Sequence, residues 1–169
     1  GGTTTLTLPM NLPGNPRIGQ AALVTNLRHA APGQLTLRLT SPSGSQAVLT
    51  AGNGGTNVDL FNGTTWTDFG AKLVTENPPT FVSGIPEPTL IPEAGLDVFR
   101  GESVNGTWTL TIIDNAAGGT GTMDSWSLAL SLYDCCGNPA PNPGSNAPIC
   151  EGSTLVLTAD TVAGATYLW

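Results

Sequence analysis

NGTWTLTIIDNAAGGTGTMDSWSLALSL, residues 105–132, decides the fold of this chain. Two alternating runs open at Trp108 and Trp126, and side chains two residues apart lie on the same face of a strand. In each run one face collects a tryptophan with aliphatic residues, while the other collects threonines in the first run and serines with an alanine in the second. This alternation predicts two strands. A helix fits poorly, because β-branched residues crowd the first run and neither run carries a helical apolar stripe.

The segment between the two runs, residues 115–122, contains three glycines. Glycine adopts the positive φ values that tight connections need, so we predict a β-hairpin with this segment as its loop. On adjacent strands, the two tryptophans would fill the same core between two sheets. The predicted core residues are Trp108, Leu110, Trp126, Leu128 and Leu130.

Short alternating runs recur along the rest of the chain. They predict strands over residues 3–8, 21–27, 35–40, 46–50 and 96–99. The sequence SPSGS from Ser41 places Pro42 and Gly44 where a type I turn prefers them, which predicts a turn between the third and fourth of these strands. Residues 77–92 contain five prolines and are predicted to form an irregular surface segment. Short strands at this spacing are typical of an all-β sandwich or barrel.

The composition favours a folded extracellular protein. Only 10% of the 169 residues are charged, and the net charge is −7. An acidic chain with four arginines and one lysine is unsuited to nucleic acid or to an anionic membrane surface. No apolar run approaches the roughly 20 residues that a membrane-spanning helix needs, so no membrane insertion is expected. A chain rich in Thr, Ser, Asn and Gly is typical of secreted β-proteins, a setting in which disulfides persist.

The composition changes after residue 134. CCGNPAPNPGSNAP, residues 135–148, is rich in Pro, Gly and Asn, as linkers are. We therefore predict a β-sandwich over residues 1–134, a linker over 135–149, and the beginning of a second domain over 150–169, where alternation resumes. Two strands cannot bury a core by themselves. We expect the chain to be part of a longer polypeptide, with its last segment packed on the sandwich or on a neighbouring chain.

The three cysteines, Cys135, Cys136 and Cys150, cannot all pair within one molecule. Because the segment between them is short, loop closure between Cys150 and Cys136 costs little entropy, and Cys135 is the alternative partner. A bridge between the two adjacent cysteines would strain the peptide bond that joins them. We therefore predict that Cys150 is bridged to Cys136, or to Cys135, and that this disulfide stiffens the joint after the sandwich.

Three stretches carry a resemblance to a known family: RHAAPGQLTLRLTSPSGSQAVL from Arg28, TTWTDFG from Thr64, and LDVFRGESVNGTWTLTIIDNAAGGTGTMDSWSLALS from Leu96. Over about residues 3–134 they resemble the P domain, or homo B domain, of proprotein convertases. The resemblance implies a jelly-roll β-sandwich that accompanies a protease domain and is not itself catalytic. Gln34 stands where the family usually has Asp, and Gly119-Thr120 replaces a frequent acidic residue. Both departures weaken any calcium site that relatives carry there.

The last 20 residues, CEGSTLVLTADTVAGATYLW, resemble the opening of the Ig-like or PKD-like repeats of large surface proteins of Bacteroidota. Such proteins are commonly exported by the type IX secretion system, so the resemblance implies a place at the cell surface. It also allows Cys150 to pair with a cysteine further along such a repeat. Thr161, within Asp160-Thr161-Val162, is similar to the O-glycan acceptor motif of that group of bacteria.

His29 is the single histidine of the chain. A Ser-His-Asp arrangement needs a histidine base held by a carboxylate, and His29 is the sole candidate for it. The G-x-S-x-G motif of the nucleophile elbow is absent. The sequence therefore predicts that the chain is not an enzyme, and that His29 has a packing or hydrogen-bonding role at the end of a strand.

Calcium is the one cofactor that the sequence suggests. Asp59, Asp68, Asp97 and Glu102 fall in or beside predicted loops, and the P-domain pattern is often acidic at the positions of Asp68 and Glu102. Ca²⁺ prefers six to eight oxygen ligands, usually with several carboxylates among them. A calcium ion would therefore sit in the loops that carry Asp68 and Glu102. The alternative interpretation is a scatter of solvated carboxylates that keeps the protein in solution.

These observations favour a structural or adhesive module of a large secreted cell-surface or filament protein. Its partners would be neighbouring domains of the same chain or other copies in a surface assembly. One alternative is the accessory P domain of a secreted subtilisin-like protease, which a catalytic domain upstream would favour. The other alternative is a carbohydrate-binding jelly roll with a glycan as its ligand. Glycan binding needs exposed aromatic side chains, and Trp66 is the candidate.

Overall fold

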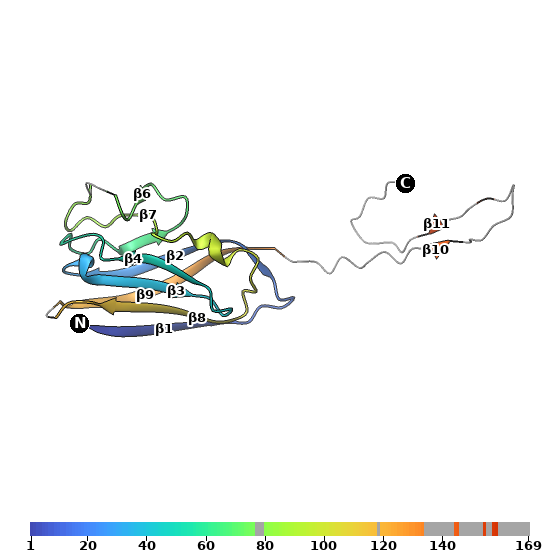
Figure 1. Cartoon of the computed structure of the whole chain (residues 1–169), viewed down its shortest axis with the longest axis horizontal. Helices are drawn as coiled ribbons and strands as arrows, with labels where there is room; N and C mark the ends of the chain where they lie inside the picture. Colours follow the sequence, from blue (N-terminus) through green and yellow to red (C-terminus); the bar gives the residue numbers. More distant parts are fainter. Residues whose placement is uncertain (77–79, 118, 134–143, 146–153, 155–156, 159–169) are drawn as a thin grey trace. The chain divides into compact units, whose positions relative to one another are not determined.

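The computed structural model describes residues 1–76, 80–117, 119–133, 144–145, 154 and 157–158. The chain divides into two units, Gly1–Asp134 and Cys135–Trp169. The first unit consists of two β-sheets that enclose a hydrophobic core, so the predicted all-β sandwich is confirmed (Figure 1). Its two single-turn 3₁₀ helices are η1 (Pro32–Gln34) and η2 (Leu96–Phe99).

The first sheet has four strands. In spatial order they are β1 (Gly2–Met10), β8 (Gly106–Asp114), β3 (Leu35–Thr40) and β4 (Gln46–Ala51). All three pairs of neighbouring strands are antiparallel. Along β3 buried leucines alternate with half-buried polar residues, as the sequence predicts. The Gly44 N–H donates to the Ser41 carbonyl oxygen at 3.0 Å, which confirms the predicted turn between β3 and β4.

The second sheet has five strands. In spatial order they are β6 (Lys72–Leu73), β7 (Thr89–Ile91), β5 (Asn62–Trp66), β2 (Arg17–His29) and β9 (Gly121–Tyr133). The strand β2 pairs antiparallel with β5 and β9, whereas β7 runs parallel to both β5 and β6. In Figure 1, β6 and β7 lie at one border of the unit and β1 lies at the opposite border. Of the predicted irregular segment over residues 77–92, the structure describes residues 80–92, and the prediction is wrong at residues 89–91, which form the paired strand β7.

The two tryptophan strands do not form the predicted hairpin. The strand β8 pairs with β1 and β3, whereas β9 pairs with β2 in the other sheet, so the chain crosses between the sheets after Asp114. Asn115 holds this crossing in place. Its N–H donates to the Gln34 carbonyl oxygen at 2.8 Å, and its side-chain Nδ2 donates to the same oxygen at 3.0 Å. The hairpin prediction is wrong because glycines permit a crossing between sheets as readily as a hairpin loop.

Trp108 lies at the centre of the core. It is fully buried, and its Nε1–H donates to the Val104 carbonyl oxygen at 3.1 Å. Its ring meets the Phe99 ring edge to face, with 5.1 Å between the ring centroids. Leu110, two residues further along β8, is also fully buried. This face of β8 therefore supplies the core from the four-stranded sheet.

The β9 residues approach the same core from the opposite sheet. Trp126, Leu128 and Leu130 pack against the buried cluster but remain partly exposed. The reason is topological, because β9 is the last strand of its sheet and pairs only with β2. The two tryptophans thus share one core, but the structure buries them to different extents.

The second unit contains a short antiparallel pair, β10 (Gly144–Ser145) with β11 (Leu157–Thr158). Cys135, Cys136, Cys150 and Thr161 lie outside the described residues, so the disulfide and the O-glycan acceptor stay predictions. The Ig-like repeat stays a prediction for the same reason. Within the part of the chain that the structure describes, no helix is long and apolar enough to cross a membrane.

Candidate docking surface

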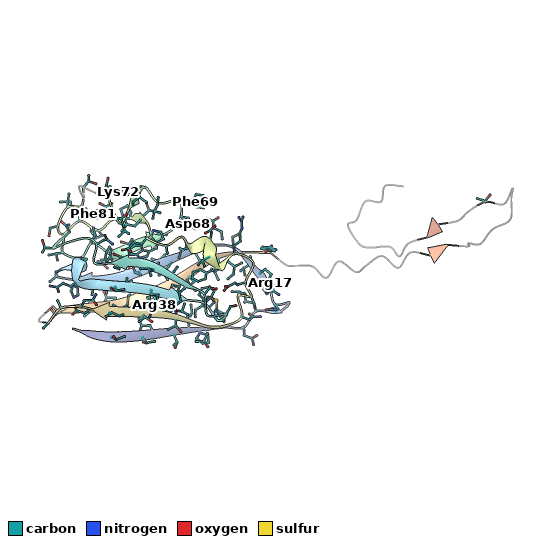
Figure 2. The ribbon with its side chains drawn as sticks, viewed as in Figure 1. Arg17, Arg38, Asp68, Phe69, Lys72 and Phe81 are labelled. Atoms are coloured by element: carbon teal, nitrogen blue, oxygen red, sulfur yellow. The ribbon has the colours of Figure 1, made fainter. Side chains whose placement is uncertain are left out.

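A hollow of about 570 Å³ opens on the sandwich between β2, the β5–β6 connection and η2. Its lining includes Asp68, Phe69, Leu73, Asp97 and Arg100, which we call the Phe69 surface. Figure 2 shows Asp68 and Phe69 at the border of the unit that carries β6 and β7. The local backbone explains why an aromatic side chain lies at this exposed position.

A tight turn between β5 and β6 presents Phe69 to solvent. The Thr67 N–H donates to the Leu90 carbonyl oxygen at 3.0 Å, and the Gly70 N–H donates to the Thr67 carbonyl oxygen at 3.2 Å. Gly70 lets the turn press on β7, because a Cβ at this position would lie only 2.6 Å from the Leu90 carbonyl carbon. With the backbone held on both sides, the Phe69 side chain remains outside the core and is 77% exposed.

Asp68 ties this turn to η2. Its Oδ1 accepts the Leu96 N–H at 2.8 Å and its Oδ2 accepts the Asp97 N–H at 2.9 Å. These N–H groups bond to a side chain and not to a neighbouring strand, so residues 96–99 turn into a 3₁₀ helix and the predicted strand is wrong. A run of four residues is too short for its pattern to separate the two structures. The buried side chains of Leu96 and Phe99 then hold η2 on the core.

The Phe69 surface combines an apolar centre with charged groups at its rim. Phe69 and Leu73 are 77% and 52% exposed, and full burial of such a side chain stabilises by about 1.5–3 kcal/mol. Arg100 is exposed at the rim and forms no ion pair with another residue in the described ranges. Apolar patches rimmed by polar groups mark sites of protein contact. The composition of this surface is therefore that of a docking site.

Lys72, which precedes Leu73 in β6, is already paired. Lys72 Nζ lies 2.7 Å from Glu87 Oε1 and 5.8 Å from the centroid of the Phe81 ring. These contacts hold the loop that follows residue 80 beside β6. Ile85, in that loop, is 58% exposed but does not line the hollow, so it serves as a control position below.

The four carboxylates predicted to bind calcium lie in three places. Asp68 and Asp97 both lie beside Gly95 at the start of η2, where Asp68 accepts the Asp97 backbone N–H. Asp59 accepts the N–H of the last residue of β2, and Glu102 accepts the Ser45 hydroxyl. Among the described residues, no group of three or more His, Cys, Asp or Glu side chains is placed to hold a metal ion. Calcium stays a prediction, and the Asp68–Asp97 pair is where two of the four acids come together.

His29 lies at the other end of the sandwich. Its Nδ1 accepts the Ala31 N–H at 3.1 Å, so the proton of the neutral ring is on Nε2. The Asp114 Oδ2 is 3.8 Å from Nε2. In the described part of the chain, no hydrogen bond joins His29 to a hydroxyl group. The hydroxyl nucleophile of a Ser-His-Asp arrangement is therefore not in place beside this ring.

Trp66, the aromatic that the carbohydrate hypothesis places at the surface, is fully buried. Its Nε1–H donates to Thr25 Oγ1 at 3.0 Å, and its ring centroid is 5.0 Å from that of Phe61. The exposed aromatic of this motif is Phe69, for which the sequence predicted no role. The available signal was its position between Asp68 and a glycine, a pattern typical of a turn tip.

The two packed sheets of the first unit place it in the class of β-sandwich domains. The model of the proprotein convertase P-domain matches residues 18–130. The chain belongs to the proprotein convertase P-domain family, and the resemblance of the sandwich is confirmed.

Similar proteins include an extracellular protease and a serine protease. The "Extracellular basic protease" of Dichelobacter nodosus is 42% identical over 50 residues, which cover 30% of this chain and 8% of that protein. The serine protease of Aeromonas sobria, solved with its chaperone, matches at 22% identity with a TM-score of 0.48 and covers 77% of this chain. The same protease solved alone matches at 21% identity with a TM-score of 0.45 and covers 76%. The chain spans 23% of each of these protease chains, and so a small part of its relatives.

Proposed function

We propose that the sandwich is a non-catalytic accessory module of a larger secreted protein, and that the Phe69 surface packs against a neighbouring domain of the same polypeptide. One observation carries this proposal. In a member of the P-domain family, a hydrogen-bonded turn holds a phenylalanine 77% exposed beside the exposed Leu73 and beside Arg100, which has no ion-pair partner among the residues that the structure describes. The neighbouring domain would cover the apolar pair and place a carboxylate against the Arg100 guanidinium.

The first candidate neighbour is the catalytic domain of a secreted serine protease of the subtilisin type. Family membership supports this choice, because the P domain is a non-catalytic companion of protease domains. The Dichelobacter nodosus relative supports secretion by its name, and the match takes up only 8% of its length. In this role the sandwich would stabilise or orient the catalytic domain and leave the chemistry to it.

The second candidate is a structural or adhesive module in a cell-surface or filament protein. It is supported by the linker-like composition after residue 134 and by the alternating residues that follow, which resemble the start of an Ig-like repeat. The neighbour would then be a repeat domain or another copy in a surface assembly. The two candidates share the same docking surface and differ in the domain that covers it.

Calorimetry of the longer polypeptide tests this function. In the natural chain that contains both the sandwich and its neighbour, we expect the two to unfold in one coupled transition. Replacing Phe69 and Leu73 together by serine should separate the transition into two, because the contact between the domains is lost. The matched control is Ile85→Ser, which changes an equally exposed apolar residue outside the hollow and should leave the coupling intact.

The proposal is wrong if the double variant unfolds in one coupled transition like the wild type. It is also wrong if Ile85→Ser uncouples the domains to the same extent. The isolated sandwich provides the check on folding. Because Phe69 and Leu73 are exposed in it, the double variant should unfold within about 0.5 kcal/mol of the wild type, as surface substitutions usually do.

A further inference from the structure

The strand β9 forms one edge of the five-stranded sheet, and it pairs only with β2. It is 13 residues long. In the part of the chain that the structure describes, no hydrogen bond outside the β2–β9 ladder reaches its main chain. Every second residue of an edge strand points its N–H and C=O away from the sheet. The free side of β9 therefore offers a row of unused backbone donors and acceptors, which is the arrangement that another extended strand binds.

The other edge strands of the sandwich are covered, short or interrupted. The Glu93 and Ala94 N–H groups donate to the Leu49 and Val48 carbonyl oxygens of β4, at 3.2 Å and 2.9 Å. The strand β6 is only two residues long. The strand β1 contains Pro9, which has no N–H to offer to a further strand. Among the strands that the structure describes, β9 is thus the longest edge left open.

The free side of β9 also lacks the features that keep edges apart. Residues 125–131, SWSLALS, contain no charged residue, no proline and no glycine. They pair with residues 20–26 of β2 in regular register, because both bulges of the β2–β9 ladder lie outside this stretch. Charges, prolines and bulges are the means by which sheets protect their edges from pairing. We call residues 125–131 the open β9 edge.

Core side chains beside the open β9 edge are incompletely covered. Trp126, Leu128 and Leu130 point toward the core but remain partly exposed. The partly buried hydrophobic residues that pack against the core all lie on the two edge strands β1 and β9: Leu6, Leu8, Met10, Met123, Trp126, Leu128 and Leu130. A strand paired with β9 would place its own apolar side chains beside those of β9 and remove both sets from water.

The open β9 edge is complementary to itself. Antiparallel pairing of two copies about Leu128 places Trp126 of one copy opposite Leu130 of the other, on the face that points toward the core. On the opposite face only serines and Ala129 meet, so no like charges oppose each other within the paired stretch. A contact made by the same segment of both copies is isologous, and it closes after two copies.

We propose that this chain forms a two-fold dimer in which the open β9 edge pairs antiparallel with the same edge of a second copy. The two five-stranded sheets would join into one continuous sheet. The strand pair is smaller than a standard protein interface, so the dimer is weak and forms reversibly as the concentration rises. None of residues 125–131 lines the hollow at the Phe69 surface, so the dimer does not rest on the docking of a neighbouring domain.

Sedimentation equilibrium of the whole 169-residue chain tests this proposal. A reducing agent is present, so that no disulfide joins two copies. We expect the average mass to rise with concentration from 17.2 kDa toward twice that value and no further. A chain that stays monomeric at its highest soluble concentration would overturn the proposal, because a second copy is then not the occupant. Assembly beyond the dimer would overturn it as well.

Two variants with charges at exposed positions locate the contact and its register. Ser127→Glu and Ala129→Lys each place a charge on the solvent-facing side of β9. Each variant alone should dimerise about tenfold more weakly, because the two copies bring like charges to neighbouring positions across the strand pair. An equal mixture of the two variants should regain the dimer. Pairing about Leu128 sets the new glutamate of one copy opposite the new lysine of the other.

Thr5→Lys is the matched control, because it adds a charge at an exposed position on β1, the edge strand of the other sheet. It should dimerise like the wild type, and circular dichroism checks that every variant is folded. The proposal is wrong if neither charge on β9 weakens the dimer, or if the mixture of the two folded variants stays monomeric. It is equally wrong if Thr5→Lys weakens the dimer as much as Ala129→Lys does.

Discussion

Replacing Trp108 and Trp126 by alanine, one at a time, measures how much each side chain contributes to the free energy of unfolding. The sequence pattern places the two residues in equivalent positions, but the structure does not. Trp108 is fully buried, donates a hydrogen bond to Val104 and contacts the Phe99 ring. Its removal should cost about 4 kcal/mol, at the centre of the range for large aromatic residues in cores. Trp126 is partly exposed on an edge strand, so its removal should cost about 2 kcal/mol.

The assay is equilibrium unfolding in urea, followed by circular dichroism at fixed pH. The predicted difference of about 2 kcal/mol corresponds to about a 30-fold difference between the variants in the folded-to-unfolded ratio. Trp108→Phe separates packing from the hydrogen bond, because it keeps a ring but loses the donor to Val104, and should cost about 1–3 kcal/mol. Equal losses for the two alanine variants would refute the assigned burial and the placement of β9 at an edge.

Three further predictions concern the turn, the metal and the cysteines. Asp68→Ala should lower the free energy of unfolding by about 2 kcal/mol, because two backbone N–H groups lose their acceptor. A loss below about 0.5 kcal/mol in urea unfolding would contradict the claim that Asp68 anchors η2. If the sandwich binds calcium, calorimetric titration with Ca²⁺ should release or absorb heat, and Asp97→Asn should reduce that heat. The calcium prediction is wrong if the titration gives no heat and EDTA leaves the melting temperature unchanged. Peptide mapping without reduction should find Cys150 bridged to Cys136, or to Cys135. A bridge between the two adjacent cysteines would contradict that prediction.

The strands were predictable from the sequence, but their partners were not. Alternation from Trp108 to Ile112 fixes which side chains enter the core, because the period of two is a property of one strand alone. It does not state which strand supplies the hydrogen bonds. The segment that begins at Asn115 satisfies a hairpin and a crossing equally well, and the choice depends on bonds to Gln34, a residue about 80 positions earlier.

The candidate sites depend on such distant contacts even more strongly. Phe69 is exposed because the backbone at Gly70 lies directly against β7. The glycine in the sequence does not indicate which strand it will contact. The surroundings of His29 bring together Gln34, the last residue of η1, and Asp114, at the end of β8, which show no common spacing in the sequence. The sequence predicts a packing or hydrogen-bonding role for His29. It does not predict which groups surround the ring, because these come from distant parts of the chain.

Hydrogen exchange tests the central claim most directly, by comparing the isolated sandwich with the longer natural polypeptide that contains its neighbouring domain. The docking account predicts that amides of the turn around Phe69 and Leu73, and of the segment from Asp97 to Arg100, exchange more slowly in the longer polypeptide. Amides of β1, on the opposite border, should exchange at the same rate in both (Figure 1). Unchanged exchange around Phe69, with slower exchange elsewhere on the sandwich, would contradict the claim that the neighbouring domain packs on this surface.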